Sequence, residues 1–352
     1  MSYEEDCRLA SLIRMADGGL SCRKENDCIM RAWQIKSYGG PEVFELNEIP
    51  DPQPKEGWVL IDIKAFGLNR SELYTRQGHS GDAVTLPRVL GIECVGVVVD
   101  GGGTGLEPGQ KVAAAMGNMG RLYDGGFAEK TLIPRSNVYP ITTDLPWEIV
   151  GALPETYLTA WGALKEAINL QPGQSLLVRG GTSSVGLAAT SIAKEMGCTV
   201  FATTRKQEKV AVLKRAGVDH VLLDNGSVEA QIKAILPDGV DGVIELVGIE
   251  HTIMDCLRST APKGTVCMVG FLADSWDYKF FPWMPSTVKL TIYSSETLHT
   301  ATATPALQTI MDKTAEGKYL PNIHQVFPFE QLPQAQTMME QNKAAGKLVV
   351  KV

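Results

Sequence analysis

The amino-acid sequence predicts an α/β protein of two structural parts, a β-rich part and a doubly wound parallel sheet flanked by helices. From Met30 to about residue 150, short apolar runs are separated by glycine and proline turns, which is typical of antiparallel β structure. From Leu153 onwards, short apolar runs alternate with segments of helical periodicity, which is typical of βαβ units. At 352 residues, 44% of them hydrophobic and 21% charged, the chain is long enough for two cores.

In the β-rich part, each expected strand is an apolar stretch bounded by turn residues. The first stretch breaks at Gly-Gly-Pro and ends in a proline-rich turn, whereas the second carries apolar residues on both faces. The expected strand regions are 30–54, 57–69, 88–102, 109–117 and 125–134. Together these short strands predict an all-β, partly barrel-like domain.

In the second part, strands and helices alternate along the chain. The strands are expected at 174–181, 198–204, 220–224, 242–248, 264–271, 289–295 and 347–352. The helices are expected at 156–168, 184–197, 205–217, 229–236, 252–260, 304–317 and 331–342. The closing strand could rejoin the β-rich part, and the remainder predicts a parallel, doubly wound sheet.

Composition and charge exclude several classes of protein. A net charge of -7 argues against a nucleic-acid partner held by bulk electrostatics. No apolar run approaches the roughly 18 residues that a membrane span needs. The 7 cysteines include no C-x-x-C pair and are odd in number, which suggests neither a zinc finger nor a disulfide framework. Because residues 1–29 also lack the features of a signal peptide, we expect a cytoplasmic protein.

The glycine-rich turn in LLVRGGTSSVGLAA (176–189) predicts a dinucleotide-binding loop of the Rossmann type. Its spacing matches G-x-G-x-x-G with serine in the middle position. The outer glycines allow the tight turn and close packing of helix on strand, and the pyrophosphate faces the helix N-terminus. The two serines add hydroxyls that could donate to phosphate oxygens. The expected cofactor-binding residues are Gly181, Ser183, Ser184, Val185 and Gly186. The alternative is a glycine-rich turn that serves packing alone.

The end of the next strand distinguishes the two nicotinamide cofactors. NAD requires a carboxylate there for the ribose 2′-hydroxyl, whereas NADP requires cations and hydroxyls for the 2′-phosphate. The stretch FATTRKQEK (201–209) has no acidic residue before Glu208. An arginine fork can bind a phosphate through two hydrogen bonds. We therefore expect NADP, bound by Thr204, Arg205 and Lys209; the alternative is a basic helix start that faces solvent.

Several stretches, in order along the chain, carry a resemblance to a known family: YGGPEVFEL, GLNRSELYTRQG, LPRVLGIECVGVVV, LTAWGAL, VRGGTSSVGLAA, AGVDHVL and AGKLVV. From Met30 to Val352 the chain resembles the medium-chain dehydrogenase/reductase superfamily. Within that superfamily it is most similar to the zinc-independent quinone oxidoreductase and enoyl reductase branch.

The resemblance implies a division of the chain into three segments. A GroES-like catalytic domain would comprise 30–151 and 297–352, around an inserted Rossmann NADP-binding domain at 152–296. Residues 1–29 would be an N-terminal extension without counterpart in the family, for which disorder is one interpretation. The resemblance also implies that the strand at 289–295 supplies an edge to a homodimer.

The resemblance further implies that no metal is bound. Zinc-dependent members carry a Gly-His-Glu triplet and a cysteine near the position of Asn69. Here the triplet reads Gly91-Ile92-Glu93, and an isoleucine cannot coordinate zinc. The structural zinc lobe of those members is also missing, because its region reads MGNMGRLYDGG (116–126), without a cysteine.

By position in the family, Asn69 and Tyr74 are the expected catalytic residues near the nicotinamide. Asn69 would hydrogen-bond the carboxamide, the ribose or the substrate oxygen. Tyr74 would donate a proton to the developing enolate, although a phenol with an ordinary pKa near 10 is a slow acid. The alternative is that Tyr74 is an amphipathic wall residue. Glu72 and Arg76 are interpreted as a solvated pair outside the site.

Family position also implies that Thr159 lies beside the nicotinamide ribose and that backbone groups of Gly270 and Phe271 flank the ring. Hydride delivery to a conjugated acceptor needs less help from a Lewis acid, because the charge delocalises onto oxygen. We therefore expect an NADPH-dependent, zinc-independent reductase of quinones or α,β-unsaturated carbonyl compounds, whose partner is that small molecule. Two alternatives stay open: a biosynthetic enoyl reductase with a bulky substrate, and a non-catalytic NADPH-binding or structural protein, a use that zeta-crystallins show for this family.

Overall fold

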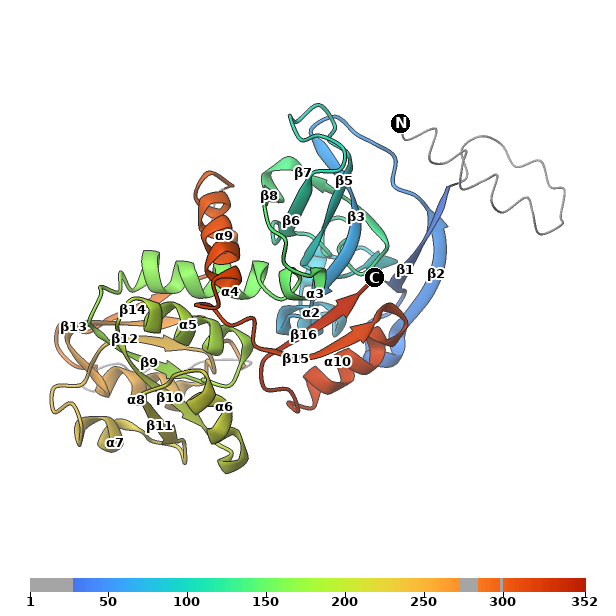
Figure 1. Ribbon diagram of the computed structural model, residues 1–352. Helices are drawn as coiled ribbons and strands as arrows, with labels where there is room; N and C mark the ends of the chain where they lie inside the picture. The colour runs from blue at the N-terminus through green and yellow to red at the C-terminus, as the bar shows by residue number, and fades with distance from the viewer. Residues whose placement is uncertain (1–27, 273–283, 298–299) are drawn as a thin grey trace, which may run out of the picture. The chain divides into compact units, whose positions relative to one another are not determined.

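The computed structural model describes residues 28–272, 284–297 and 300–352 (Figure 1). Residues 1–27, most of the predicted extension, lie outside this description. The chain divides into two compact units, and each is described by itself. The first unit comprises Met1–Thr142, Phe327–Gln341 and Val350–Val352, and the second comprises Thr143–Val326 and Asn342–Val349.

The β-rich half of the fold contains two sheets. The smaller sheet has the order β2-β1-β4, and the larger has the order β15-β16-β3-β5-β6-β8 with β7 beside β3. Their strands are β1 (Ile29–Ile35), β2 (Phe44–Pro50), β3 (Trp58–Gly67), β4 (Arg88–Val89), β5 (Glu93–Asp100), β6 (Lys111–Ala115), β7 (Lys130–Pro134), β8 (Val138–Pro140), β15 (Ile323–Pro328) and β16 (Lys347–Lys351). β3 is buried on both faces over most of its length, as its apolar residues on both faces predict. β15 is not predicted from the sequence, because its stretch IHQVFP is exposed at most positions.

Helices α2 (Arg70–Arg76) and α10 (Leu332–Glu340) pack against each other in the first unit. No helix is predicted from the sequence at α2, because the segment is too short to show a clear apolar periodicity. Asn69 begins it as the N-cap, and the Glu72 carboxylate accepts the backbone N–H of Asn69, in the manner of a capping box. The pairing of α2 with α10 is fixed by polar contacts, among them an ion pair between Arg76 and Glu340.

The second unit is built on a parallel sheet with the order β11-β10-β9-β12-β13-β14. Its strands are β9 (Ser175–Arg179), β10 (Thr199–Thr204), β11 (His220–Leu223), β12 (Val240–Glu245), β13 (Thr260–Met268) and β14 (Lys289–Ile292). The chain moves outward from β9 to β11 and then returns to β12 on the other side of β9. This reversal is the point at which doubly wound sheets bind ligands, outside the carboxyl ends of their strands. The doubly wound prediction is confirmed.

Helices cover both faces of this parallel sheet (Figure 1). The described helices of the second unit are α3 (Trp147–Val150), α4 (Pro154–Gly162), a π-helix (Ala163–Ala167), α5 (Ser184–Glu195), α6 (Val210–Arg215), α7 (Glu229–Lys233), α8 (Glu250–Arg258) and α9 (Thr300–Ala315). Short 3-10 turns occupy Pro41–Val43, Gly81–Ala83, Arg135–Asn137, Gln207–Lys209, Ser295–Thr297 and Phe329–Gln331. A buried cluster under α8 includes Leu177, Phe201, Val243, Ile253 and Val266, so side chains from four strands and the helix share one core.

The compact units differ from the predicted domains at three segments, because 143–151 and 342–349, as well as 297–326, belong to the second unit. The resemblance assigns residues 297–352 to the GroES-like domain as a block, but 297–326 belong to the second unit. The physical reason is packing, because α9 lies against α4. Only Phe327–Gln341 and the last residues, from Val350, return to the first unit.

Among the described residues, no helix is long and apolar enough to cross a membrane. Cys94, Cys198, Cys256 and Cys267 are free and buried.

Candidate functional site

The glycine-rich loop between β9 and α5 requires glycine at three positions. Gly180 has φ of +84°, in the left-handed region. A Cβ on Gly181 would lie 2.9 Å from the Cβ of Ala202 in β10, and one on Gly186 would lie 2.8 Å from the carbonyl oxygen of Gly181. Helix α5 therefore begins against the loop at a separation that no side chain permits. The steric demands of a dinucleotide loop are met even though serine replaces the middle glycine.

Ser183 acts as the N-cap of α5. Its Oγ accepts the backbone N–H of Gly186 at 3.1 Å and donates to the carbonyl oxygen of Gly180 at 2.9 Å. The hydroxyl is thus used inside the loop, so the expectation that it donates to a phosphate does not fit this geometry. Within the part of the chain that the structure describes, the backbone N–H groups of Ser184 and Val185 have no hydrogen-bond partner. Free N–H groups at a helix N-terminus are suited to an anion.

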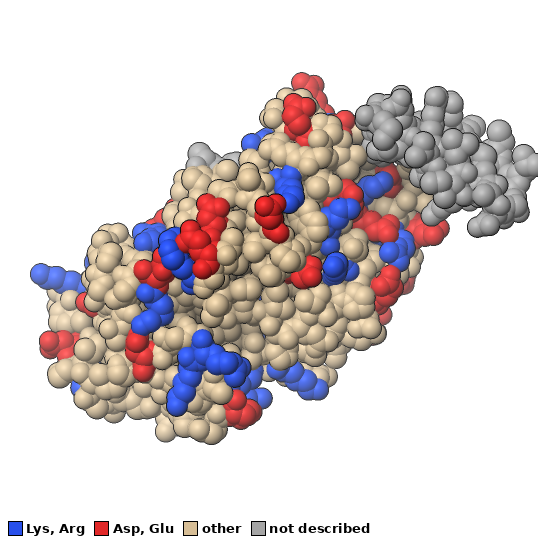
Figure 2. Space-filling model, viewed as in Figure 1, with Lys and Arg blue, Asp and Glu red and all other residues tan. Residues whose placement is uncertain are grey.

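Three cations gather after the end of β10, where the 2′-phosphate of NADP is expected. Arg205 and Lys206 are exposed, and Nζ of Lys209 donates to the carbonyl oxygen of Ala344 at 2.8 Å. Burial of Lys209 and the neighbouring charges of Lys206 and Arg205 lower its pKa. Lys and Arg side chains gather in Figure 2 over the position that α6 has in Figure 1. β10 itself contributes no acidic residue to this cluster.

Thr204 has a local role in the same turn. Its Oγ1 accepts the backbone N–H of Lys206 at 3.2 Å and lies 3.3 Å from the carbonyl oxygen of the same residue. The side chain is 4% exposed. Thr204 therefore shapes the turn that carries Arg205 and Lys206.

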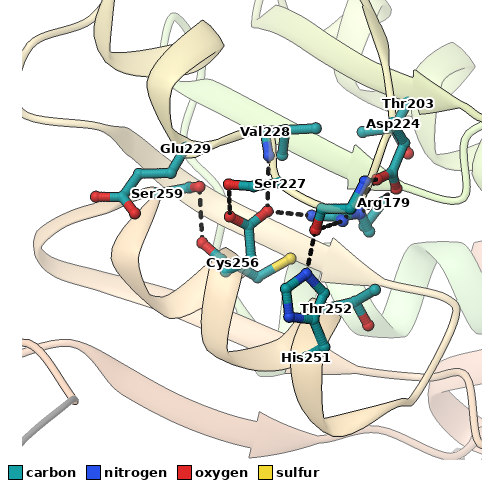
Figure 3. A network of polar contacts seen from close by, with 12 residues as sticks. Arg179, Thr203, Asp224, Ser227, Val228, Glu229, His251, Thr252, Cys256 and Ser259 are labelled. Atoms are coloured by element: carbon teal, nitrogen blue, oxygen red, sulfur yellow. Dashed lines mark hydrogen bonds and ion pairs between the residues drawn. The ribbon is translucent and has the colours of Figure 1, made fainter.

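A buried arginine ties the start of the loop to two other elements (Figure 3). Arg179, the last residue of β9, is fully buried and forms two hydrogen bonds with Asp224, at 2.6 and 2.9 Å, and one with Asp255 of α8, at 2.5 Å. Asp255 also accepts from Ser227 and from the backbone of Val228. The segment after β11 is thereby fixed against the strand that leads into the glycine loop.

At the carboxyl ends of β12 and β13, two loops touch through glycine. A Cβ on Gly248 would lie 2.0 Å from the carbonyl oxygen of Gly270, and one on Gly270 would lie 2.1 Å from the backbone carbon of Leu246. Phe271, next in the chain, is 39% exposed. The close approach explains why both positions are glycine. The predicted ring-flanking residues, Gly270 and Phe271, thus lie at the carboxyl edge of the parallel sheet.

Thr159 faces a buried carboxylate in the second unit. Its Oγ1 donates to Oε1 of Glu155 at 3.0 Å, and Oγ of Ser295 donates to the same oxygen at 2.6 Å. Thr159 is 7% exposed. Because its proton is directed to Glu155, the hydroxyl of Thr159 is left as an acceptor for a further donor.

In the first unit, Asn69 lies between two buried carboxylates. Its Nδ2 donates to Oε1 of Glu93 at 2.8 Å, and its backbone N–H donates to Oε2 of Glu72 at 2.9 Å. Oε1 of Glu72 accepts the backbone N–H of Ile92 at 3.0 Å. Glu72 and Glu93 are 1% and 0% exposed. The interpretation of Glu72 and Arg76 as a solvated pair is wrong, because both are buried and Glu72 serves the backbone around Asn69.

Tyr74 is half-buried on α2, where its ring stacks with that of His79 at a centroid separation of 6.0 Å. Asn69 and Tyr74 therefore belong to the same short helix. Four carboxylates that hold predicted site residues or nearby loops by hydrogen bonds were not themselves predicted as site residues. They are Glu72, Glu93, Glu155 and, at the end of β12, Glu245, which accepts from the backbone N–H of Gly248. The signal that could have found the two strand residues is a carboxylate inside an apolar run, since a buried charge is retained only with partners.

The residues at the position of the family's catalytic zinc do not fit that metal. Ile92 has no ligating atom, and its backbone N–H is bonded to Glu72. Glu72 and Glu93 already accept hydrogen bonds from Asn69. Among the described side chains, no group of three or more His, Cys, Asp or Glu could hold a metal ion.

Comparison with known proteins agrees with this architecture. Two family models match the chain, an alcohol dehydrogenase GroES-like domain at 55–143 and a zinc-binding dehydrogenase at 184–311. Quinone oxidoreductase of Mus musculus is 31% identical over 251 residues, 69% of this chain and 73% of that protein. Quinone oxidoreductase of Pongo abelii is 28% identical over 330 residues, 92% of this chain and 98% of that protein.

Among solved structures, the mycobacterial protein Rv1454c, complexed with NADPH, is 26% identical with a TM-score of 0.81. The match covers 92% of this chain and 100% of that one. The GroES-like and Rossmann halves expected from the sequence are both confirmed. The sheet order, the glycine loop and these matches lead to one conclusion: the chain belongs to the medium-chain dehydrogenase/reductase superfamily, in its quinone oxidoreductase branch.

Proposed function

We propose that the protein is an NADPH-dependent, zinc-independent reductase of quinones or α,β-unsaturated carbonyl compounds. The observation that carries the cofactor half is the pairing of a helix N-terminus, whose first N–H groups are unbonded, with the cation cluster after β10. Membership of the quinone oxidoreductase branch supports the reaction half. The lack of a ligating atom on the Ile92 side chain supports a reaction that does not use zinc.

Each end of the cofactor has its own proposed binding residues. The N–H groups of Ser184 and Val185 hold the pyrophosphate, while Arg205 and Lys209 hold the 2′-phosphate. Thr159, with its proton committed to Glu155, accepts a hydrogen bond from the nicotinamide ribose. When bound, NADPH supplies the hydride that reduces a conjugated acceptor. The remaining task of the protein is to orient the two reactants and to exclude side reactions.

Asn69 and Tyr74 have different proposed roles in the first unit. The Nδ2 group of Asn69 is directed at Glu93, so its Oδ1 is the atom that we assign to the carboxamide or to a ribose hydroxyl. Tyr74 donates the proton that neutralises the enolate or hydroquinone oxygen, with water as the alternative donor. Glu72 and Glu93 fix the orientation of Asn69 and touch no substrate.

The test of this proposal is the oxidation of NADPH by the purified chain in the presence of a simple quinone and, separately, a simple enone. Turnover with either acceptor, and faster with NADPH than with NADH, supports the proposal. A single-turnover measurement separates a slow enzyme from a non-catalytic NADPH-binding protein. An enzyme that reduces bulky enoyl compounds but neither simple acceptor is instead the biosynthetic reductase.

We also propose that two copies of the chain associate through β14. This strand ends the parallel sheet, and Ile292 is 58% exposed on it. An edge strand presents unpaired N–H and C=O groups that a second copy can satisfy. Sedimentation of the purified chain, compared with an Ile292→Lys variant, tests this proposal. A dimer that the substitution converts to monomer supports it, and a wild-type monomer contradicts it.

A further inference from the structure

Glu245, the last residue of β12, is a fully buried carboxylate with three hydrogen-bond donors around it. Its Oε2 accepts the backbone N–H of Gly248 at 2.6 Å. Its Oε1 accepts the backbone N–H of Val247 at 3.2 Å and the hydroxyl of Thr252 at 2.9 Å. The side chain therefore holds the loop that follows β12 and the first turns of α8.

The backbone of Glu245 holds a second loop. Its carbonyl oxygen accepts the N–H groups of Val269, at 2.8 Å, and Gly270, at 3.0 Å, directly after β13. One residue thus connects both loops at the carboxyl edge of the sheet, next to the contact between Gly248 and Gly270. A change in the bonding of this carboxylate acts directly on the loop after β12, and it reaches the loop after β13 through the close contact between Gly248 and Gly270.

Few charged groups of the described residues lie near the carboxylate of Glu245. In the sheet, Glu245 pairs with Arg179 of β9 on one side and with Met268 of β13 on the other. Arg179 is itself bound by Asp224 and Asp255. On α8, Asp255 and the buried thiol of Cys256 face this region. Burial outweighs the hydrogen bonds and the attraction of Arg179, and it raises the pKa of Glu245 to about 7.

We propose that Glu245 is a positioning residue for the nicotinamide end of the cofactor, holding the loops after β12 and β13 in the conformation that receives the ring. The inference rests on the proposed function, because it needs a nicotinamide cofactor. A carboxylate accepts all three hydrogen bonds, whereas a neutral carboxyl must donate a proton where it now accepts one. Protonation therefore weakens the support of the loops and lowers the affinity for the ring.

The experiment compares two ligands on the full chain between pH 6 and pH 8.5. One ligand is NADPH, and the other is 2′-phosphoadenosine 5′-diphosphoribose, which keeps the 2′-phosphate and the pyrophosphate but lacks the nicotinamide. Affinities are measured for the wild type, Glu245→Gln and Thr252→Val. The 2′-phosphate titrates near pH 6 by analogy with other phosphate monoesters, and the fragment and the glutamine variant both correct for it.

At pH 8 we expect Glu245→Gln to bind NADPH about tenfold more weakly than the wild type. At pH 6 the difference falls below about threefold, because Glu245 of the wild type is then protonated and supports the loops no better than glutamine does. Affinity for the fragment is unchanged by the substitution at either pH. Thr252→Val leaves both backbone hydrogen bonds to Glu245 in place, so the NADPH affinity of this variant still depends on pH. The midpoint of that dependence moves to higher pH, because the carboxylate has lost one hydrogen-bond donor. Equal pH profiles for wild type and Glu245→Gln, or equal losses on NADPH and the fragment, overturn the inference.

Two further outcomes keep the inference separate from the proposed function. If the wild type binds neither ligand, the proposed function fails and this inference fails with it. If Glu245→Gln does not fold, the wild type alone decides. Its affinity for NADPH must fall more steeply than its affinity for the fragment between pH 8 and pH 6, and parallel profiles overturn the inference.

Discussion

The side-chain amide of Asn69 donates from Nδ2 to Oε1 of Glu93 over 2.8 Å, and Glu93 is fully buried. The orientation of Asn69 is therefore set by Glu93 of β5 together with Glu72 of α2. A carboxylate buried in this way is costly unless donors surround it, so the pair stabilises the fold and fixes the proposed site together.

Replacement of Glu93 by leucine removes the nearest acceptor of the Asn69 amide. We expect the free energy of unfolding to fall by about 1–3 kcal/mol, because the half-buried amide keeps only its longer contacts with Gly67 and Glu72. The reductase activity falls as well, since Asn69 can reorient. Glu93→Gln is the matched control, because its amide oxygen can still accept. Denaturant unfolding and kcat/KM check both effects, and equal behaviour of the two variants contradicts the role given to Glu93.

Replacement of Ser183 by alanine distinguishes an N-cap from a phosphate ligand. The hydroxyl bonds to Gly180 and Gly186, so we expect a loss of about 1 kcal/mol in stability. NADPH affinity changes less than about threefold, because the phosphate is assigned to backbone N–H groups. Thermal unfolding and a binding titration measure the two quantities. A large loss of affinity with unchanged stability would show that the hydroxyl itself binds phosphate.

Replacement of Arg205 by aspartate tests the cofactor preference. We expect NADPH affinity to fall by about tenfold or more, because a carboxylate replaces the guanidinium beside the 2′-phosphate. NADH affinity stays the same or improves, since aspartate can accept from a ribose hydroxyl. Arg215→Asp is the matched control, with the same change of charge on an exposed residue at the end of α6. Unchanged NADPH affinity in Arg205→Asp removes the assignment.

Glu245 makes the stability of the protein depend on pH. Burial raises its pKa from the ordinary value of 4.5 to about 7. Between these two values the folded state binds a proton that the unfolded state has released. The contribution to stability is therefore complete below pH 4.5 and is lost as the pH rises to 7, by up to about 3 kcal/mol.

Urea unfolding at pH 5 and pH 8 measures this loss. Other groups titrate in the same range, so the comparison is made with Glu245→Gln, which cannot release a proton. We expect the wild type to lose more stability than the variant between the two pH values. Identical losses would mean that Glu245 has an ordinary pKa in the folded state.

Much of the fold is predictable from local sequence patterns. The alternation of apolar strands with helices from Leu153 onwards predicts the parallel sheet, because both periods are visible along the chain. The spacing of Gly181 and Gly186 predicts the loop, because the demand for glycine is local. The absence of an acid after β10 has the same local character. These features need no knowledge of distant contacts.

The parts that escape prediction depend on contacts between distant segments. The sequence indicates only that Glu93 lies in a strand, and its hydrogen bond with Asn69 is visible only in the structure. Ser183 reads as a phosphate donor, but its hydroxyl is satisfied by the turn that it begins. The place of α9 depends on its packing against α4 rather than on its own sequence. Glu245 reads as one acid in an apolar strand, and its three donors appear only once the loops are folded.

The central claim is that the chain reduces conjugated acceptors with NADPH. The most direct test is the rate of cofactor oxidation by the purified wild-type chain with a simple quinone, measured with NADPH and with NADH under the same conditions. We predict quinone-dependent oxidation of NADPH, with kcat/KM about tenfold or more above that for NADH, from the phosphate contacts of Arg205 and Lys209. Equal rates with the two cofactors would contradict the NADP assignment. Absence of oxidation with this quinone and with a simple enone would contradict the proposed reaction.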